Sequence, residues 1–170
     1  MAPCTIPLRQ ALTVARDEKK RSVRRNFGGD AREDKGFEAV SDTVYEYTLR
    51  EGVKFWDGKD LTSADVKYTW DRMISEDDRP GFASVKSVEA PDSHTIRVTL
   101  TKPDASWQYT PTQFYSVIYQ KEFAERAGDK FGQPSTLVMG TGPWRVDSMN
   151  PTTGLELSAF DDYWGGKPPI

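Results

Sequence analysis

The sequence predicts a mixed α/β fold in which hairpin-rich sheets are flanked by helices. Segments in which apolar residues alternate with period two occur beside segments of helical spacing, and turn residues separate neighbouring strands. No strand–helix–strand unit repeats along the chain, so we expect mostly antiparallel pairing. The 170 residues include 5 Trp, 7 Tyr and 8 Phe, and 36% of residues are hydrophobic, which is enough for a packed core.

The first 36 residues differ from the rest in charge and in aromatic content. They carry a net charge of +4, which leaves −7 for residues 37–170, and Phe27 is their one aromatic residue. This composition predicts that residues 1–40 form an atypical basic, disordered extension. A basic arm can bind nucleic acid or anionic lipid, but no stacking aromatics accompany the arginines, so an extension with no such partner is favoured. Its longest apolar run is too short for a signal peptide.

The first regular element is a strand at residues 43–50, where Tyr45, Tyr47 and Leu49 share one face. A short second strand is expected at residues 53–56, ending at the Asp57-Gly58 turn.

A helix is predicted at residues 63–75. Thr62 is its expected N-cap, and Asp65 stands three residues later, in the position of a capping-box acid. Helical spacing places four apolar residues in one stripe: Val66, Trp70, Met73 and Ile74.

The remaining elements follow from alternation and from turn residues. A hairpin joins residues 85–90 to residues 95–100 through a turn at 91–94, and Asp104 can cap a brief helix that carries Trp107. Further along we expect a strand at 114–119, a helix at 121–127 closed by Gly128, and a hairpin of strands 143–149 and 155–160.

No catalytic or metal-binding constellation is found. Residues 140–142 (GTG) precede Pro143 and a strand pattern rather than a helix, which argues against a phosphate loop. Residues 92–94 (DSH) are neighbours in a turn and cannot converge as a triad. Cys4 and His94 are the only residues of their kinds. We therefore expect no catalytic residues, no metal and no cofactor, and a binding protein rather than an enzyme.

Several aromatic residues lie near the ends of elements, where a ligand pocket could use them. Core packing is the favoured role for each one alone. They are Trp56, Phe82, Trp107, Tyr109, Phe114 and Tyr115.

Two blocks of sequence resemble the family 5 solute-binding proteins of ABC importers, the group of oligopeptide-, dipeptide- and nickel-binding proteins. The first block comprises YTLREGVKFWDG at 47–58, LTSADV at 61–66 and WDR at 70–72. The second comprises GTGPW at 140–144 and FDDYWGGKP at 160–168. The resemblance spans residues 41–170. The signature residues are expected to be structural: they make turns, cap a helix, and allow close backbone approach at Gly140 and Gly142.

The resemblance implies part of one lobe of a type II periplasmic-binding-protein fold. Residues 41–118 would form the small accessory domain of lobe I, and residues 119–170 would begin its ligand-binding part. The implied function is that of a fragment of the substrate-binding component of an ABC-type peptide importer, which closes on a peptide or other small solute and meets an importer permease. Family members work in the periplasm or at the extracellular face of the membrane.

The ligand contacts that the resemblance implies are Phe82, in residues 80–84, and Gln113. An alternative of a different class stays open: a truncated structural or interaction module that does not bind solute and that self-associates through exposed lobe surface.

Overall fold

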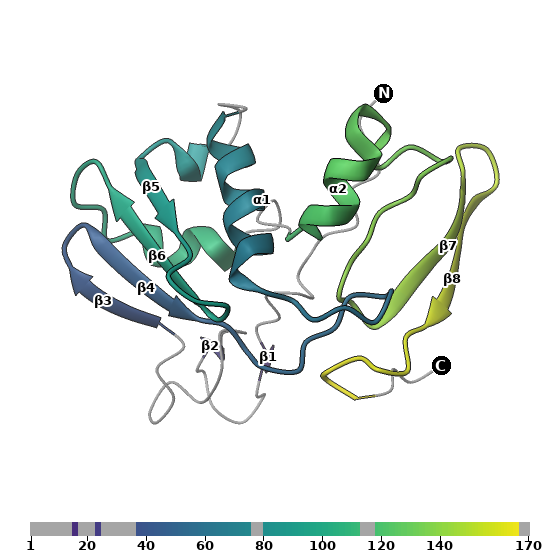
Figure 1. The fold of residues 1–170 in the computed structure, drawn as a ribbon, viewed down its shortest axis with the longest axis horizontal. Coiled ribbons are helices and arrows are strands. Elements are labelled where there is room, and N and C mark those ends of the chain that lie inside the picture. The colour runs from purple at the N-terminus through teal and green to yellow at the C-terminus, as the bar shows by residue number, and fades with distance from the viewer. Residues whose placement is uncertain (1–14, 17–22, 25–36, 76–79, 113–117, 167–170) are drawn as a thin grey trace.

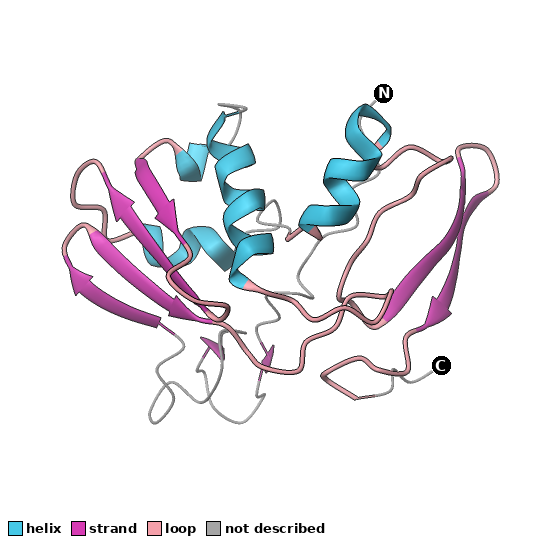
Figure 2. Ribbon diagram, viewed as in Figure 1, coloured by secondary structure: helices cyan, strands magenta, loops and turns pink. Residues whose placement is uncertain are grey.

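The computed structural model describes residues 15–16, 23–24, 37–75, 80–112 and 118–166. Two regions are visible in Figure 1: a four-stranded sheet with helix α1 at one side of the molecule, and a two-stranded ribbon at the other, with helix α2 between them. We call residues 37–112 the four-stranded unit and residues 144–159 the ribbon. The mixed α/β class predicted from the sequence is confirmed, as the helices and strands in Figure 2 show.

All pairings in the four-stranded sheet are antiparallel, and its strand order is β3-β4-β6-β5. Tyr45 lies opposite Val98 and Tyr47 lies opposite Ile96 in the β4–β6 pair. The predicted alternation is confirmed, because the side chains of Tyr45, Tyr47 and Leu49 are all buried. The strands are β3 (Phe37–Ser41), β4 (Val44–Thr48), β5 (Val85–Glu89) and β6 (Thr95–Leu100).

Strand β3 is an element that the sequence did not predict, and it crosses the expected domain boundary at residue 40. Phe37 pairs with Tyr47 and Ala39 pairs with Tyr45, so this segment is the edge of the sheet rather than part of an extension. Upstream, β1 (Ala15–Arg16) pairs with β2 (Val23–Arg24) in a short antiparallel ladder. The other residues before Phe37 lie outside the described part of the chain.

Helix α1 (Ser63–Ser75) has the predicted bounds and lies against the sheet. Val66, Trp70 and Met73 are buried, as the apolar stripe requires. One half of the predicted capping box is present, because the Thr62 N–H donates to Asp65 Oδ2 at 3.0 Å. The other half differs: the Thr62 hydroxyl donates to the same carboxylate oxygen at 2.9 Å, instead of accepting from a backbone N–H.

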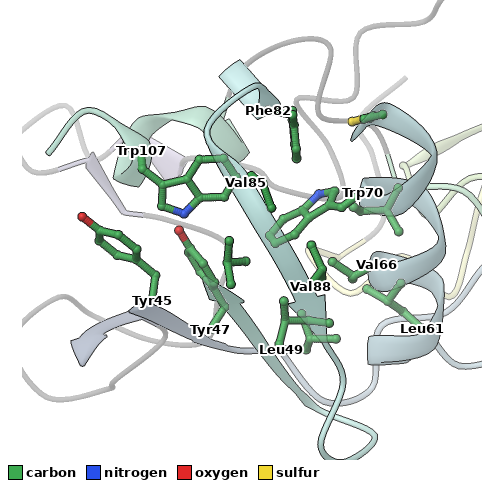
Figure 3. Close-up of a cluster of buried hydrophobic side chains, with 14 of the residues drawn as sticks. Tyr45, Tyr47, Leu49, Leu61, Val66, Trp70, Phe82, Val85, Val88 and Trp107 are labelled. Carbon is green, nitrogen blue, oxygen red and sulfur yellow. The ribbon is translucent and has the colours of Figure 1, made fainter. Parts of the chain in front are cut away.

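An aromatic cluster forms the centre of the core between α1 and the sheet (Figure 3). The Trp70 ring meets Tyr47 edge-on at a centroid distance of 5.8 Å and Trp107 edge-on at 6.3 Å. Phe82 meets Trp107 edge-on at 5.5 Å. These edge-to-face arrangements are the ones that ring quadrupoles favour, and all four side chains are almost entirely buried.

Short 3₁₀ helices bring two of these rings into place: η1 (Pro80–Phe82) carries Phe82 and η2 (Trp107–Thr112) carries Trp107. The brief helix predicted after Asp104 is thus present as a 3₁₀ helix, and Asp104 Oδ1 accepts from the Ser106 N–H at 2.9 Å.

Two strand predictions need correction. Residues 53–56 form a single bridge, Lys54 to Asp60, rather than a strand. Of the strand predicted at 114–119, residues 118–119 are not in a strand, and residues 113–117 lie outside the described chain. A turn follows Phe55 at once, since the Phe55 N–H donates to the Lys59 carbonyl and the Gly58 N–H to the Phe55 carbonyl. The local chain therefore folds back before a strand can extend.

The second region holds helix α2 (Lys121–Ala127), the 3₁₀ turn η3 (Gly128–Lys130), and the ribbon of β7 (Trp144–Asn150) and β8 (Gly154–Ala159). The predicted helix end is confirmed, because Gly128 has φ of 51°. The predicted hairpin is confirmed by the antiparallel β7–β8 pairing. Leu155 and Leu157 of β8 remain 37% and 48% exposed.

Candidate functional site

The candidate site is built where the loop between β4 and α1 meets the segment that enters β7. The Trp56 backbone N–H donates to the Gly140 carbonyl at 3.0 Å, and its indole Nε1–H donates to the Gly142 carbonyl at 2.9 Å. A Cβ on Gly140 would lie 3.0 Å from Trp56 Cζ2. The expectation that Gly140 allows a close approach is therefore confirmed, and Trp56 is the group that approaches.

Thr141 sits between these two glycines and is 2% exposed. Its hydroxyl oxygen has no hydrogen-bond partner among the described residues. Pro143 and strand β7 follow, which agrees with the expectation that this glycine pair does not cradle a phosphate at a helix terminus. The GTG segment is thus a tightly packed corner between the two regions of the molecule.

A compact loop precedes this corner. The Gly132 N–H donates to the Leu137 carbonyl at 2.9 Å, and the Leu137 N–H donates to the Gln133 carbonyl at 2.7 Å, so the loop closes on itself. Leu137 has φ of 63°, a left-handed conformation that a branched side chain rarely adopts and that costs on the order of 1 kcal/mol. Residues 137–140 are all half-buried. A strained, half-exposed apolar segment therefore lies next to Trp56.

Of the two ligand contacts implied by the resemblance, Phe82 lies away from the Trp56 corner. Phe82 is 1% exposed and packs against Trp70 and Trp107 in the core, about as buried as a side chain can be. Gln113 lies outside the described residues.

The other aromatic residues singled out in the sequence divide between core and surface. Trp107 is fully buried, as core packing requires, whereas Tyr109 is 53% exposed. Trp56 is half-buried at the corner described above. Phe114 and Tyr115 lie outside the described residues.

Four carboxylates have pKa values below their ordinary range, and each shift has a local cause. The backbone N–H of His94 holds down the pKa of Asp92, and the Ser106 hydroxyl holds down that of Asp104. The Lys59 ammonium lowers the pKa of Glu122, and the Ser158 hydroxyl, followed by Arg145, lowers that of Asp147.

Each of these shifts favours the ionised carboxylate in a turn, an ion pair or a strand pair. A general acid near neutral pH needs the opposite shift. In the Asp92–His94 turn, the carboxylate accepts from the His94 backbone N–H at 2.8 Å, so it orients the turn and not the imidazole. This confirms the turn predicted from the sequence.

Within the described ranges, no group of three His, Cys, Asp or Glu residues is placed to hold a metal ion. No helix among those residues is both long enough and apolar enough to cross a membrane.

Comparison with known proteins defines the class. The fold matches solved solute-binding proteins, among them the PBP/SBP MoaA from A. tumefacien R10 in complex with mannopinic acid, at a TM-score of 0.70 and 30% identity over 83% of this chain and 29% of that one. The oligopeptide-binding protein AppA from Bacillus subtilis, at 22% identity, shares the fold at a TM-score of 0.71 over 86% of this chain and 30% of that one. The architecture is part of a type II periplasmic-binding-protein fold.

A family model described as bacterial extracellular solute-binding proteins, family 5, middle, matches residues 33–170, and the chain belongs to this family. Heme-binding protein A of Haemophilus influenzae is 31% identical over 77% of this chain, and the dipeptide-binding protein of Escherichia coli K12 is 29% identical over 75%. The chain spans about 28% of the length of both relatives.

The match corrects the predicted extent of the resemblance, which was expected to begin at residue 41. It begins at residue 33, and strand β3 gives the structural reason, because Phe37–Ser41 is an edge of the family sheet. The contact between Trp56 and Gly140 is not predicted by the sequence. The two residues belong to the two signature blocks, which was the one indication available. No local pattern in either block indicates that the blocks are in contact.

Proposed function

We propose that this chain contributes one wall of the binding site in the solute-binding component of an ABC importer. In the whole protein the two lobes would close on a peptide-type solute outside the cytoplasmic membrane, and the solute would be released unchanged to a permease. One observation carries the proposal: Trp56 of the first signature block donates hydrogen bonds to the carbonyls of Gly140 and Gly142 in the second block, although Trp56 and Gly142 are 86 residues apart in the chain.

The wall that we propose consists of residues 137–140 and the Trp56 ring. Ligand sites are lined mainly by apolar and aromatic groups, with a few backbone polar groups to orient the ligand. Residues 137–140 are half-buried, and the strained backbone of Leu137 is of the kind that clusters at ligand-holding sites. Trp56 is tied to the end of this segment, because its backbone and indole N–H groups donate to the carbonyls of Gly140 and Gly142.

The peptide class is supported by the names of the relatives. Besides the dipeptide-binding protein, glutathione-binding proteins of Salmonella and Escherichia coli are 28–30% identical over 71–74% of this chain. Heme-binding protein A is as similar as these, at 31% identity. We infer that the part of each relative that matches this chain supplies a wall common to the family. Residues in the remaining parts of those proteins would then determine which ligand is bound.

The remaining predictions from the resemblance are carried into this proposal. Residues 41–118 form the accessory domain, with β3 added to it, and residues 119–170 begin the ligand-binding part. Phe82 and Gln113 stay predicted ligand contacts. Because Phe82 is 1% exposed, we expect its substitution to lower the free energy of unfolding more than it lowers ligand affinity.

Nuclear magnetic resonance can test the wall on this chain directly. We expect millimolar dialanine, trialanine or glutathione to shift the Trp56 indole N–H signal and the backbone signals of residues 137–142. Calorimetry should show weak binding, because most of a clamshell site lies beyond the share of the relatives that this chain covers. Micromolar affinity would contradict the one-wall proposal.

Two matched variants sharpen the measurement. Trp56→Phe keeps an aromatic ring and removes the indole donor to Gly142, and should reduce the ligand-induced shifts of the backbone signals of residues 137–142. Trp164→Phe alters another half-buried tryptophan outside the proposed wall and should leave them unchanged. Shifts confined to the four-stranded sheet, or none with any peptide, would refute the proposed wall.

A second candidate, self-association, is favoured by one observation: Leu155 and Leu157 of the ribbon are exposed on the same strand. An exposed apolar face can mark an interaction surface. Light scattering of the wild type and of Leu157→Ser distinguishes the candidates. A concentration-dependent mass that the substitution abolishes supports association, whereas a monomer at all concentrations excludes it.

A further inference from the structure

A polar seam joins helix α1 to the segment that leads into α2. Asp65 and Thr69 are four residues apart on α1, so their side chains lie on the same face, one turn from each other. Asp65 Oδ1 accepts from the Lys121 backbone N–H at 2.8 Å, and Thr69 Oγ1 accepts from the Tyr119 backbone N–H at 2.9 Å. In extended chain, alternate N–H groups point the same way, which lets the two acceptors hold residues 119 and 121 together.

The Asp65 carboxylate serves two helices at once. Its Oδ2 accepts from the N–H and the hydroxyl of Thr62 at the start of α1, while its Oδ1 serves Lys121, the first residue of α2. Gln120, the residue before α2, makes no capping bond with its own side chain. An N-terminal helix end is stabilised by a negative charge and by acceptors for its free N–H groups. Asp65 provides both for α1 and α2, and it is only 7% exposed.

The residue between these two anchors is held by a different part of the four-stranded unit. Gln120 is 4% exposed, and its side-chain Nε2 donates to both carboxylate oxygens of Asp57 at 2.9 Å. Next to it, the Lys59 ammonium pairs with the Glu122 carboxylate. Residues 119–122 are thus fixed on one side by α1 and on the other by the 57–59 turn.

We infer that Asp65 is a positioning residue that locks α2 onto the four-stranded unit, so that the two move as one rigid body. Rotation of α2 would have to break the bond from Lys121 while leaving the buried carboxylate half-satisfied, which is unfavourable. Any closure motion of the protein then pivots outside the seam. The inference concerns the orientation of α2 and does not rest on which solute is bound.

The test compares four variants of the full chain by hydrogen exchange and by residual dipolar couplings. Asp65→Ala removes both caps. Asp65→Asn keeps one oxygen acceptor and can serve only one helix end fully. Thr69→Val keeps the side-chain shape and removes the acceptor for Tyr119. Asp71→Asn alters an exposed acid of the same helix that pairs with Lys67, and is the matched control.

In Asp65→Ala we expect the amides of residues 119–124 to exchange at least tenfold faster, while those of β4 and β6 change by less than twofold. In Asp65→Asn and Thr69→Val, the exchange rates of these amides should lie between those of Asp65→Ala and those of the wild type. In Asp71→Asn they should equal the wild-type rates. Dipolar couplings measure orientation rather than stability. α1 and α2 should fit one alignment tensor in the wild type and require two in Asp65→Ala.

If Asp65→Ala does not fold, the same measurements on Asp65→Asn and Thr69→Val test whether α2 is locked onto the four-stranded unit. One tensor together with unchanged protection of residues 119–124 in Asp65→Asn and Thr69→Val overturns the inference. An equal acceleration of all amides in those variants also overturns it, because it would show that the seam contributes only to global stability.

Discussion

The four-stranded unit and the ribbon are both antiparallel and both rely on a tight hairpin, yet they differ in how much apolar surface they bury. The unit encloses a continuous cluster that includes Trp70, Phe82 and Trp107, each at most 1% exposed. From the ribbon, no described residue joins that cluster, and Leu155 and Leu157 remain open. Strand pairing alone therefore does not make a core.

The difference lies in the second layer. Helix α1 covers one face of the sheet and inserts Trp70 between Tyr47 and Trp107, so the sheet buries its apolar face completely. Val146 is the buried apolar residue of β7, and on β8 the described side chains are exposed or half-exposed. A two-stranded hairpin without a covering layer is marginally stable in water. The free energy of unfolding of this chain should therefore arise mainly from the four-stranded unit.

The largest effect is expected for Trp70→Ala. Its ring is fully buried against three other rings, and its removal leaves a cavity that should lower the free energy of unfolding by about 3–5 kcal/mol. Urea unfolding followed by circular dichroism measures this loss. Tyr109→Ala, at an exposed aromatic position, is the control and should cost less than about 1 kcal/mol. Equal losses in the two variants would show that the cluster does not dominate stability.

A smaller effect is expected for Gly140→Ala, at the contact between the two regions. The new Cβ would lie 3.0 Å from Trp56 Cζ2, so the indole must shift away from its bond to Gly142. We expect a loss of roughly 1–2 kcal/mol in thermal unfolding, within the range for overpacked sites. Combining it with Trp56→Leu should recover much of that loss, because the clash is then removed. Strict additivity would show that the two residues do not interact.

The smallest effect concerns protonation in the ribbon. The Ser158 hydroxyl is the main cause that holds the pKa of Asp147 below its ordinary 3.8, so Ser158→Ala should raise this pKa toward that value. Because the folded pKa is depressed, the carboxylate stabilises the fold above about pH 3.8, and this contribution is lost as the pH falls through the folded pKa. A carbon-13 titration of the carboxyl groups measures the shift.

Asp92, in the four-stranded unit, is the internal reference for that titration. Its pKa is lowered by its own turn, chiefly by the His94 backbone N–H, so it should titrate identically in the wild type and in Ser158→Ala. A shift at both sites would mean that the substitution disturbs the whole fold and not the ribbon alone.

The sequence predicted those elements whose signal is local. Helix α1, helix α2 and both hairpins carry their own periodicity and turn residues, and the structure confirms them. Strand β3 was missed because Phe37–Ser41 follows a charged stretch, and its pairing shifts between Ala39 and Ser41. Such an irregularity breaks the period-two pattern by which a strand is found in a sequence.

The candidate site was less predictable because its contacts are not local. The Trp56–Gly140 contact joins residues far apart in the chain, and the left-handed backbone of Leu137 occurs at a residue type that gives no warning of it. One part of the role of Asp65 could be predicted, because its capping of α1 follows from its spacing after Thr62. Its bond to Lys121 could not, because that bond depends on how α1 and α2 are placed relative to each other.

The spacing of paired residues has a consequence for the order in which the molecule folds. Glu46 of β4 and Arg97 of β6 lie 51 residues apart in the chain, whereas Ser148 and Glu156 of the ribbon lie 8 apart. Closing a short loop sacrifices less chain entropy and is faster. The ribbon can therefore form early, as can the β3–β4 and β5–β6 hairpins, whose strands are also close in the chain. The pairing of the two central strands, β4 and β6, closes a much longer loop, and it therefore forms only after helix α1 has brought these strands close together.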